Sequence, residues 1–442
     1  MIKDLRKVGM LRDLAGGIQI DINAVAKGDS EGSSCNHNCT TESGSYDCPA
    51  AFSFNKGLKK NFASESQIIQ WVDKAAEGVR KSTQYFLDTQ LDSVKERLGY
   101  PEEVVSQVRK ARGHRQVEVN LFGGNPEMHP EVLKIIRTLK RKKYLVNFTT
   151  TGRRFMLEKA FGEELLKHPP DVIALSADDF DPKEFKTMLQ LSRADIKKAW
   201  YSVPPSAGQR QKALEALYAA RYIGKGRPQV LFNMVLHSGN MADARTMVEK
   251  LQGAFPTALL NPYPMQSSFM YQTGSYSKEY LEEFSTFVDW MLSNHSVEKG
   301  APGFVPRLHY WMLLRTILDN SSGTRQAELL SGEAWRCYTQ SLGGGYVQIG
   351  RSRNPVPLEH PGGKLGCFWN DRTITQQGPV RSAPQVQEYI QEFREGLGTS
   401  SASPCGGCLM PRLMDDCITT ESGMSEELVL AYKGVRMKNL NY

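Results

Sequence analysis

The sequence lacks the long apolar runs that mark membrane proteins. No stretch of its 442 residues approaches the roughly 18 consecutive apolar residues that a bilayer-spanning helix needs. The first residues, MIKDLRKVGMLRDLAGG, have basic side chains but no continuous apolar segment and no small-residue cleavage site, so they do not resemble a secretion signal. We therefore expect a soluble, cytoplasmic protein.

A large excess of one charge is also absent. Lysine plus arginine number 55 and aspartate plus glutamate 48, which gives a formal net charge of +7. Basic residues gather in short patches at 140–143 (KRKK) and 153–154 (RR), which would suit an acidic substrate or an electron-donor protein. A solvated helix end is the simpler interpretation, and the charge pattern gives no clear sign of nucleic-acid binding.

Cysteine is missing from the whole middle of the chain. The eight cysteines form two groups, Cys35, Cys39 and Cys48 near the start, and Cys337, Cys367, Cys405, Cys408 and Cys417 near the end. Disulfides are rare in a reducing compartment, so grouped thiolates favour soft-metal ligation, and the C-x-x-C pair favours a metal or redox site. Buried, unreactive thiols are the alternative.

Between the two cysteine groups, short apolar segments alternate with amphipathic ones. We predict strands at 16–25, 116–124, 144–152, 171–179, 199–203, 229–237 and 257–265. We predict helices at 65–98, 101–112, 131–143, 155–167, 182–193, 208–223, 241–252, 276–295 and 307–319. Repeated βα units of this length imply an α/β fold with a parallel sheet, open or closed toward a barrel.

The composition changes near residue 300, where glycine, proline and serine become frequent. We place a domain boundary at 300–330. A first unit, residues 1–300, then contains a cysteine loop at 31–50 and a helical insertion at 51–115. A second unit, residues 301–442, is loop-rich with a hairpin strand at 343–350, and its few apolar residues suggest that a metal site stabilises it.

The first cysteine group offers three ligands, one fewer than a structural zinc site takes unless His37 supplies the fourth. Three thiolates can instead hold three irons of a 4Fe–4S cluster. The fourth iron then stays open to a non-protein ligand, as a catalytic cluster requires. With three cysteines present, we expect His37 to lie beside the cofactor as a loop residue.

The order of these features resembles the radical S-adenosylmethionine (SAM) superfamily. That family has a strand, a cysteine loop usually spaced C-x3-C-x2-C, a helix, and a strand that ends in a Gly-Gly-x-Pro turn. Cys35 and Cys39 keep the first interval, whereas eight residues separate Cys39 from Cys48. Tyr46 resembles the aromatic residue common near the last cysteine.

Similarity to the family continues along residues 15–270. It implies that SAM is bound by the turn after the second strand and by polar groups on later strands, namely Gly123, Gly124, Asn125, Pro126, Glu127, Ser176 and Asn233. The turn's backbone would receive the methionyl ammonium, with the glycines allowing close approach. Ordinary strand polar groups are the alternative for Ser176 and Asn233. We expect His129 to cap the following helix and His237 to be a satisfied core histidine.

The second cysteine group resembles the auxiliary-cluster domains called SPASM and Twitch. The resemblance implies that Cys337, Cys367, Cys405 and Cys408 hold one auxiliary 4Fe–4S cluster, and that Cys417 either replaces one of them or is a free thiol. The Twitch-like arrangement fits better, because a full SPASM domain would normally need seven cysteines. A four-cysteine zinc site is the competing interpretation.

The resemblance as a whole implies a partial (β/α)6 TIM-like barrel and a radical enzyme of the oxidoreductase type. One electron from a flavodoxin- or ferredoxin-like donor would cleave SAM to methionine and a 5′-deoxyadenosyl radical. That radical would remove a hydrogen atom from a peptide, a protein or a small metabolite, and the auxiliary cluster would aid oxidation or crosslinking.

No general base stands out in the sequence. Asp178, Asp179 and Tyr263 are candidates because they lie at strand ends that should face the barrel mouth. Few residues precede Cys35, which keeps a small metabolite open as the substrate. The alternative functions are a non-catalytic Fe–S electron-transfer protein and a zinc-stabilised α/β binding protein.

Overall fold

The computed structural model describes most of the chain between residues 117 and 294, and separate pieces outside it. The described residues are 17–22, 62–85, 88, 92, 102, 106, 117–122, 125–177, 182–204, 208–224, 228–264, 277–294, 311, 315, 318, 347–349, 364–365 and 374–375. All eight cysteines lie outside them, as do His37, Tyr46, Gly123, Gly124, Asp178 and Asp179. Both cluster sites therefore remain predictions.

A sequential parallel sheet forms the centre of the described structure. Its first six strands are β1 (Gly17–Asp21), β2 (Glu118–Phe122), β3 (Leu145–Thr150), β4 (Val172–Ser176), β5 (Gln229–Leu236) and β6 (Leu259–Pro264). Each pairs in parallel with the next along the chain. A barrel has this sequential order, whereas a doubly wound sheet reverses it at a switch point. The predicted α/β fold of partial TIM-like type is confirmed.

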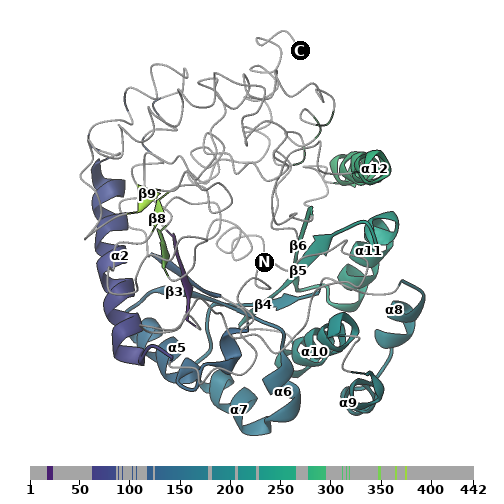
Figure 1. Ribbon diagram of the computed structural model, residues 1–442, viewed down its shortest axis with the longest axis horizontal. Coiled ribbons are helices and arrows are strands. Elements are labelled where there is room, and N and C mark those ends of the chain that lie inside the picture. The colour runs from purple at the N-terminus through teal and green to yellow at the C-terminus, as the bar shows by residue number, and fades with distance from the viewer. Residues whose placement is uncertain are drawn as a thin grey trace.

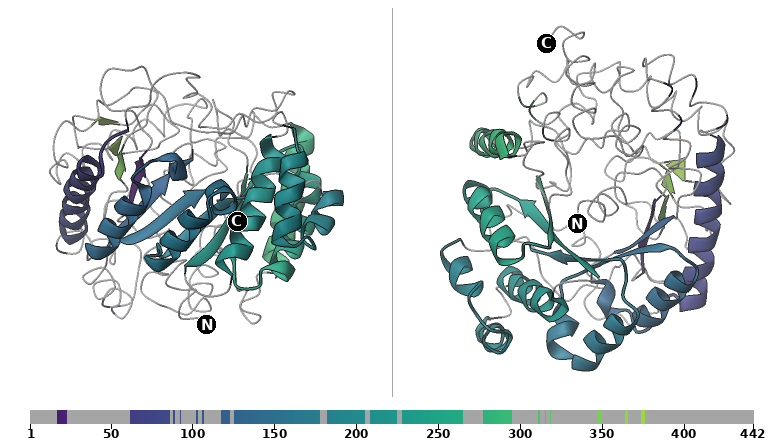
Figure 2. Two further views of the ribbon diagram at one scale, coloured as in Figure 1. Left: turned by 90° about the horizontal axis from the view of Figure 1, so that it is seen from below. Right: turned by 180° about the vertical axis from the view of Figure 1, so that it is seen from behind.

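Helices cover the outer side of the curved sheet (Figure 1). They are α2 (Glu65–Tyr85), α5 (Val132–Arg141), α6 (Arg153–Leu157), α7 (Lys159–Lys167), α8 (Pro182–Met188), α9 (Arg193–Ser202), α10 (Gly208–Ile223), α11 (Ala244–Ala254) and α12 (Lys278–Asn294). The right-hand view of Figure 2 shows them as an arc, with α2 and α12 toward its two ends. The sheet thus has a helix-covered face and an inner face.

The two faces differ in their side chains because successive residues of a strand point to opposite sides. Strand residues such as Phe148 and Phe232 belong to the large core shared with the helices. A separate apolar cluster, made of Val172, Ala174, Leu231 and Leu259, has the opposite phase and marks the inner face. Polar residues with this same phase include Asn120, Asn147, Thr149, Ser176, Asn233 and Asn261.

Three short strands from the tail extend the same sheet. Strand β7 (Val347–Ile349) lies parallel to β1, and β8 (Lys364–Leu365) and β9 (Ile374–Thr375) follow in antiparallel order. The predicted strand at 343–350 is confirmed over the residues of β7. The division into two domains remains a prediction.

The described positions of the predicted helix 307–319 pack against α12. Trp311, Arg315 and Leu318 are helical. The fully buried ring of Trp311 meets Phe287 edge-on, with centroids 5.7 Å apart. Arg315 Nη1 lies 3.1 Å from Asp289 Oδ2. These positions therefore belong to the outer layer of the barrel.

The predicted strand at 199–203 is wrong, because these residues end helix α9 and begin the turn that follows. The side chain of Ser192 caps the helix by accepting a hydrogen bond from the Asp195 N–H at 3.2 Å. Ile196 and Trp200 are buried at helical spacing. The sequence AWYSV resembles a strand only when it is considered without the residues of the preceding helical turn.

The predicted helix at 155–167 is two helices, α6 and α7. They separate at Glu158, whose φ of −124° and ψ of 89° lie outside the helical region. The chain enters α6 through Gly152, which has a φ of 92°. A Cβ added at Gly152 would lie 2.7 Å from Ala219 Cβ and 2.8 Å from the Glu215 carbonyl oxygen. The end of β3 therefore approaches α10 too closely for any side chain at this position.

Gly152→Ala is expected to lower the free energy of unfolding by about 3 kcal/mol, because left-handed strain and a backbone clash add together. Gly224→Ala is the matched control, since Gly224 has a φ of 72° but nothing within 4 Å of the added Cβ. Its loss should be about 1 kcal/mol. Urea denaturation measures both, and equal losses would show that the contact with α10 is unimportant.

Candidate functional site

The turn after β2 is buried against the end of β3. It forms the short 3-10 helix η3 (Pro126–Met128), with proline at its start, where an N–H is not needed. Asn125 is 0% and Glu127 1% exposed. Of the residues that the sequence assigns to SAM binding in this turn, the structure describes Asn125, Pro126 and Glu127.

The carboxylate of Glu127 connects this turn to the next strand and helix. Its Oε2 accepts a hydrogen bond from Thr150 Oγ1 at 2.6 Å. Its Oε1 accepts from Asn125 Nδ2 at 2.9 Å, and from Thr151 Oγ1 and the Arg154 N–H, each at 3.3 Å. Since both oxygens accept hydrogen bonds from the chain itself, the side chain acts as an anchor of the turn.

Two buried carboxylates lie near each other at this corner. Burial raises the pKa of Glu127, hydrogen bonds from Thr150 and Asn125 oppose this change, and the nearby charge of Glu215 adds to it. Glu215 is 0% exposed and accepts a hydrogen bond from Trp200 Nε1 at 3.0 Å. Arg153 Nε lies 4.0 Å from Glu215. This arginine therefore offsets part of the buried negative charge.

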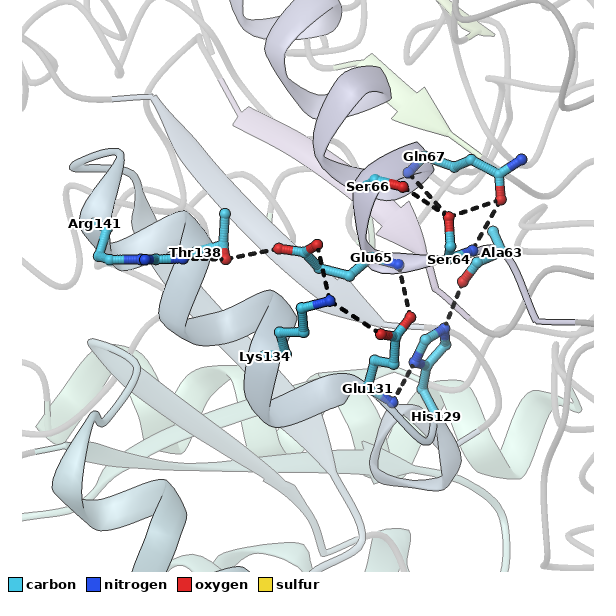
Figure 3. Close-up of polar contacts among 10 residues, drawn as sticks. All are labelled: Ala63, Ser64, Glu65, Ser66, Gln67, His129, Glu131, Lys134, Thr138 and Arg141. Carbon is cyan, nitrogen blue, oxygen red and sulfur yellow. Dashed lines mark hydrogen bonds and ion pairs between the residues drawn. The ribbon is translucent and has the colours of Figure 1, made fainter.

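His129 joins the same turn to the start of α2 (Figure 3). Its Nδ1 accepts a hydrogen bond from the Glu131 N–H at 3.1 Å, and its Nε2 lies 3.0 Å from the carbonyl oxygen of Ala63. An accepting Nδ1 leaves the proton on Nε2, so the ring is neutral. Burial accordingly lowers the pKa of His129. The prediction that His129 caps α5 is wrong, because the N-cap of this helix is Glu131. His129 lies two residues earlier, where its carbonyl accepts from the Val132 N–H.

A set of polar contacts fixes the first turn of α2 against α5 (Figure 3). Glu131 Oε2 accepts from the Glu65 N–H at 2.9 Å, so a negative side chain lies at the amino end of α2. Thr138 Oγ1 donates to Glu65 Oε1 at 2.7 Å. Lys134 Nζ lies 3.5 Å from Glu65 and 3.3 Å from Glu131. The helix that follows the predicted cluster loop is thereby held beside the β2 turn.

Polar side chains from adjacent strands meet on the inner face. Ser176 is the register partner of Asn233, and Asn233 of Asn261. Asn261 Nδ2 donates to Asn233 Oδ1 at 2.8 Å. Tyr263 lies two residues beyond Asn261 on β6, closer to the carboxyl edge of the sheet. The structure thus brings Ser176 and Asn233 together and places Tyr263 on the same face.

Three inner-face residues were missed from the sequence, Asn120, Asn147 and Asn261. Each is an asparagine within an apolar strand, in VEVNLF, LVNFTT and LLNPYP. Strands of a parallel sheet are covered on both faces and favour apolar side chains on both. A polar amide within such a strand is therefore a signal of a candidate functional residue. The period-two phase of these asparagines could have predicted that they share one face.

His237 follows β5 in a hydrogen-bonded turn. Its Nδ1 accepts from the Gly239 N–H at 3.1 Å, and its own backbone N–H donates to Asn240 Oδ1 at 2.8 Å. Asn240 Nδ2 donates to the Val235 carbonyl at 2.9 Å. His237 is therefore a buried histidine that is bonded within the fold through Nδ1 and its backbone N–H.

Residues of both basic patches form ion pairs within the chain. Lys140 Nζ lies 2.6 Å from Asp171 Oδ2, and Lys142 Nζ lies 2.9 Å from Asp73 Oδ2. Arg154 Nη2 lies 2.7 Å from Glu158 Oε2. These contacts favour the simpler interpretation, helix ends with local ion pairs. Separately, every helix among the described residues is too short or too polar to cross a membrane.

Comparison with known proteins finds a family match within this chain. Residues 53–251 match the family described as the radical SAM superfamily. The segment is less than half of the 442 residues and reaches from before α2 into α11. Over these residues the chain is similar to the radical SAM superfamily. No curated protein matches the sequence.

Two solved structures of Streptococcus suis SuiB resemble this chain weakly. The first, bound to S-adenosylmethionine, is 13% identical with a TM-score of 0.36, and the match covers 67% of this chain and 52% of SuiB. The second, bound to the precursor peptide SuiA, is 12% identical with a TM-score of 0.41, and the match covers 92% and 73%. The chain thus spans about half the length of the first structure.

Glu127→Ala is expected to lower the free energy of unfolding by about 3 kcal/mol or more, because it leaves several donors without their acceptor. Glu127→Gln keeps one oxygen for most of these donors and should lose about 1 kcal/mol. Chemical denaturation of both variants measures the difference. Similar losses in the two variants would mean that Glu127 fills space without anchoring the turn.

The Glu127→Gln variant also tests the raised pKa of Glu127. A carboxyl with a higher pKa in the folded state binds more protons there, so its contribution to stability falls as the pH rises above 4.5 through the folded-state value. The wild type should lose stability relative to the variant over that window. A constant difference between the two proteins across this pH range would exclude the raised pKa.

Proposed function

We propose that this protein is a radical SAM enzyme that removes a hydrogen atom from a peptide, a protein or a small metabolite. The carrying observation is that the radical SAM match at 53–251 includes strands β2 to β5 of the sequential parallel sheet. The order of the cysteines and the secondary-structure elements along the sequence also supports the proposal. Cys35, Cys39 and Cys48 lie between the end of β1 and the start of α2, where this proposal needs the cluster loop.

The three cysteines suit a 4Fe–4S cluster by their chemistry and by their position in the chain. Soft thiolates are the usual ligands of such clusters, and three of them leave one iron open. The carboxyl ends of parallel strands meet at one edge of the sheet, so a loop that leaves β1 starts at the same edge as the β2 turn. When bound there, the cluster would supply the electron that cleaves SAM to a 5′-deoxyadenosyl radical.

The residues of the chain itself would bind and orient. We assign the methionine end of SAM to the turn that contains Gly123, Gly124 and Asn125, and further contacts to Ser176 and Asn233. Glu127 would act through Asn125, whose Nδ2 donates to it at 2.9 Å. A group held by buried hydrogen bonds needs little rearrangement when its ligand binds. The barrel would also exclude water from the radical.

The tail is assigned an auxiliary 4Fe–4S cluster on Cys337, Cys367, Cys405 and Cys408, with Cys417 left over. With four cysteine ligands such a cluster is closed, which suits electron transfer from a substrate radical and hence oxidation or crosslinking. A flavodoxin- or ferredoxin-like protein would supply the first electron. Asp178, Asp179 and Tyr263 are the proposed groups for proton transfer at the barrel mouth, and the cytoplasm is the proposed location.

Anaerobically reconstituted protein is expected to be brown, to hold about eight irons, and to release 5′-deoxyadenosine from SAM when a reductant is added. Replacing Cys35, Cys39 and Cys48 together by alanine should abolish that release, because the open-iron cluster is lost. Chromatography of the reaction mixture measures the nucleoside. Cys417→Ala is the matched control and should change neither the release nor the iron content.

Persistent release in the triple variant would refute the proposed function. An iron content of about four per wild-type chain would refute the proposed auxiliary cluster, whereas the proposed chemistry of the barrel would stand. A colourless wild-type protein that holds zinc would favour the binding-protein alternative. Brown protein that releases no 5′-deoxyadenosine would favour a pure electron-transfer role.

A further inference from the structure

A polar group on β2 and β3 has no part in the proposed SAM contacts. Asn120 on β2 and Asn147 on β3 are register partners. Thr149 lies two residues beyond Asn147, so it shares the inner face. Thr149 Oγ1 donates to Asn120 Oδ1 at 3.3 Å. Two amides and a hydroxyl from adjacent strands therefore occupy one patch, here called the amide patch.

Within the amide patch, the presence of a polar side chain at Asn147 is not explained by a contribution to the stability of the fold. It is 3% exposed, and its Oδ1 is buried without a hydrogen-bond partner in the part of the chain that the structure describes. A buried amide oxygen without a donor destabilises the folded state. A leucine of similar shape would remove that unfavourable contribution. A polar group that weakens its own strand is better explained by a ligand.

The surroundings of Asn147 restrict what that ligand can be. Its oxygen needs an N–H or O–H donor. Its register partner on β4 is the apolar Val172, and the described inner-face positions of β2 to β6 include no lysine or arginine, whereas Glu118 on β2 is acidic. An anionic group would have no cation to pair with at those positions. An uncharged amide offers a donor and an acceptor in one plane, which is the complement of an asparagine side chain.

We propose that the amide patch, centred on Asn147, binds an uncharged amide of the substrate. Asn147 would accept a hydrogen bond through Oδ1 and donate one through Nδ2. The patch would thus favour a peptide backbone or a primary amide over an anionic metabolite. Its role as a substrate site rests on the proposed function, whereas its binding of an amide does not.

Binding is tested on the full-length protein with three probes, a secondary amide, a smaller primary amide, and an ester matched in shape to the secondary amide. They are N-methylpropionamide, propionamide and methyl propionate, observed by saturation-transfer NMR. The wild type should bind an amide and discriminate against the ester, which has no N–H. Stronger binding of N-methylpropionamide indicates a backbone-type amide, and stronger binding of propionamide a primary amide. Asn147→Leu should weaken amide binding about tenfold, and Thr149→Val should weaken it less.

Thermal unfolding separates a ligand-binding asparagine from a structural one. Asn147→Leu should leave the unfolding midpoint unchanged or raise it, because a buried oxygen without a partner is removed. Asn240→Leu is the matched control, since Asn240 is 1% exposed and its amide bonds the backbone of His237 and Val235. That variant should unfold at a lower temperature.

Several results would overturn the proposal. They are ester binding as strong as amide binding, wild-type amide affinity in Asn147→Leu, an unfolding midpoint of Asn147→Leu as low as that of Asn240→Leu, and displacement of the probes by saturating SAM. Release of 5′-deoxyadenosine is measured on the same wild-type preparation. If the protein releases 5′-deoxyadenosine but binds no amide, only the proposed amide site is refuted. If it binds an amide but releases no 5′-deoxyadenosine, only the proposed function is refuted.

Discussion

The buried carboxylate of Glu127 is the contact on which the arrangement of the site depends. It gathers donors from the β2 turn, the end of β3 and the start of α6. Such a group is stable in a buried place only when its hydrogen bonds are complete. Gly152 brings the same corner against α10, and His129 ties the turn to α2. The corner therefore connects the helix layer to the edge where the parallel strands end.

The alternation of side chains along each strand gives the two faces of the sheet different compositions and different roles. Alternation sends one set of side chains into the helix-covered core and the other onto the inner face. The outer set is largely apolar and contributes most to stability. The inner set combines a small apolar cluster with asparagines, one of which has a buried oxygen without a partner among the described residues. Stability is thus concentrated on the helix-covered side, and polar groups suited to ligands lie on the other.

The order of strands and helices was predictable because each βα unit carries its own period and end signals. The prediction failed at 199–203, where five residues fitted a strand and the cap at Ser192 was overlooked. The role of Glu127 was not predictable. Motif spacing grouped Glu127 with SAM ligands, whereas its oxygens bond Thr150 and Arg154, and these contacts form only when the chain folds.

The most direct test of the proposed radical SAM chemistry is whether the proposed N-terminal cluster has one iron open to SAM. Electron paramagnetic resonance of the anaerobically reduced protein, recorded with and without SAM, measures this before any substrate is known. We predict that SAM changes the spectrum, because a ligand on the open iron alters the cluster's electronic environment. A cluster spectrum that saturating SAM leaves unchanged would contradict the assignment.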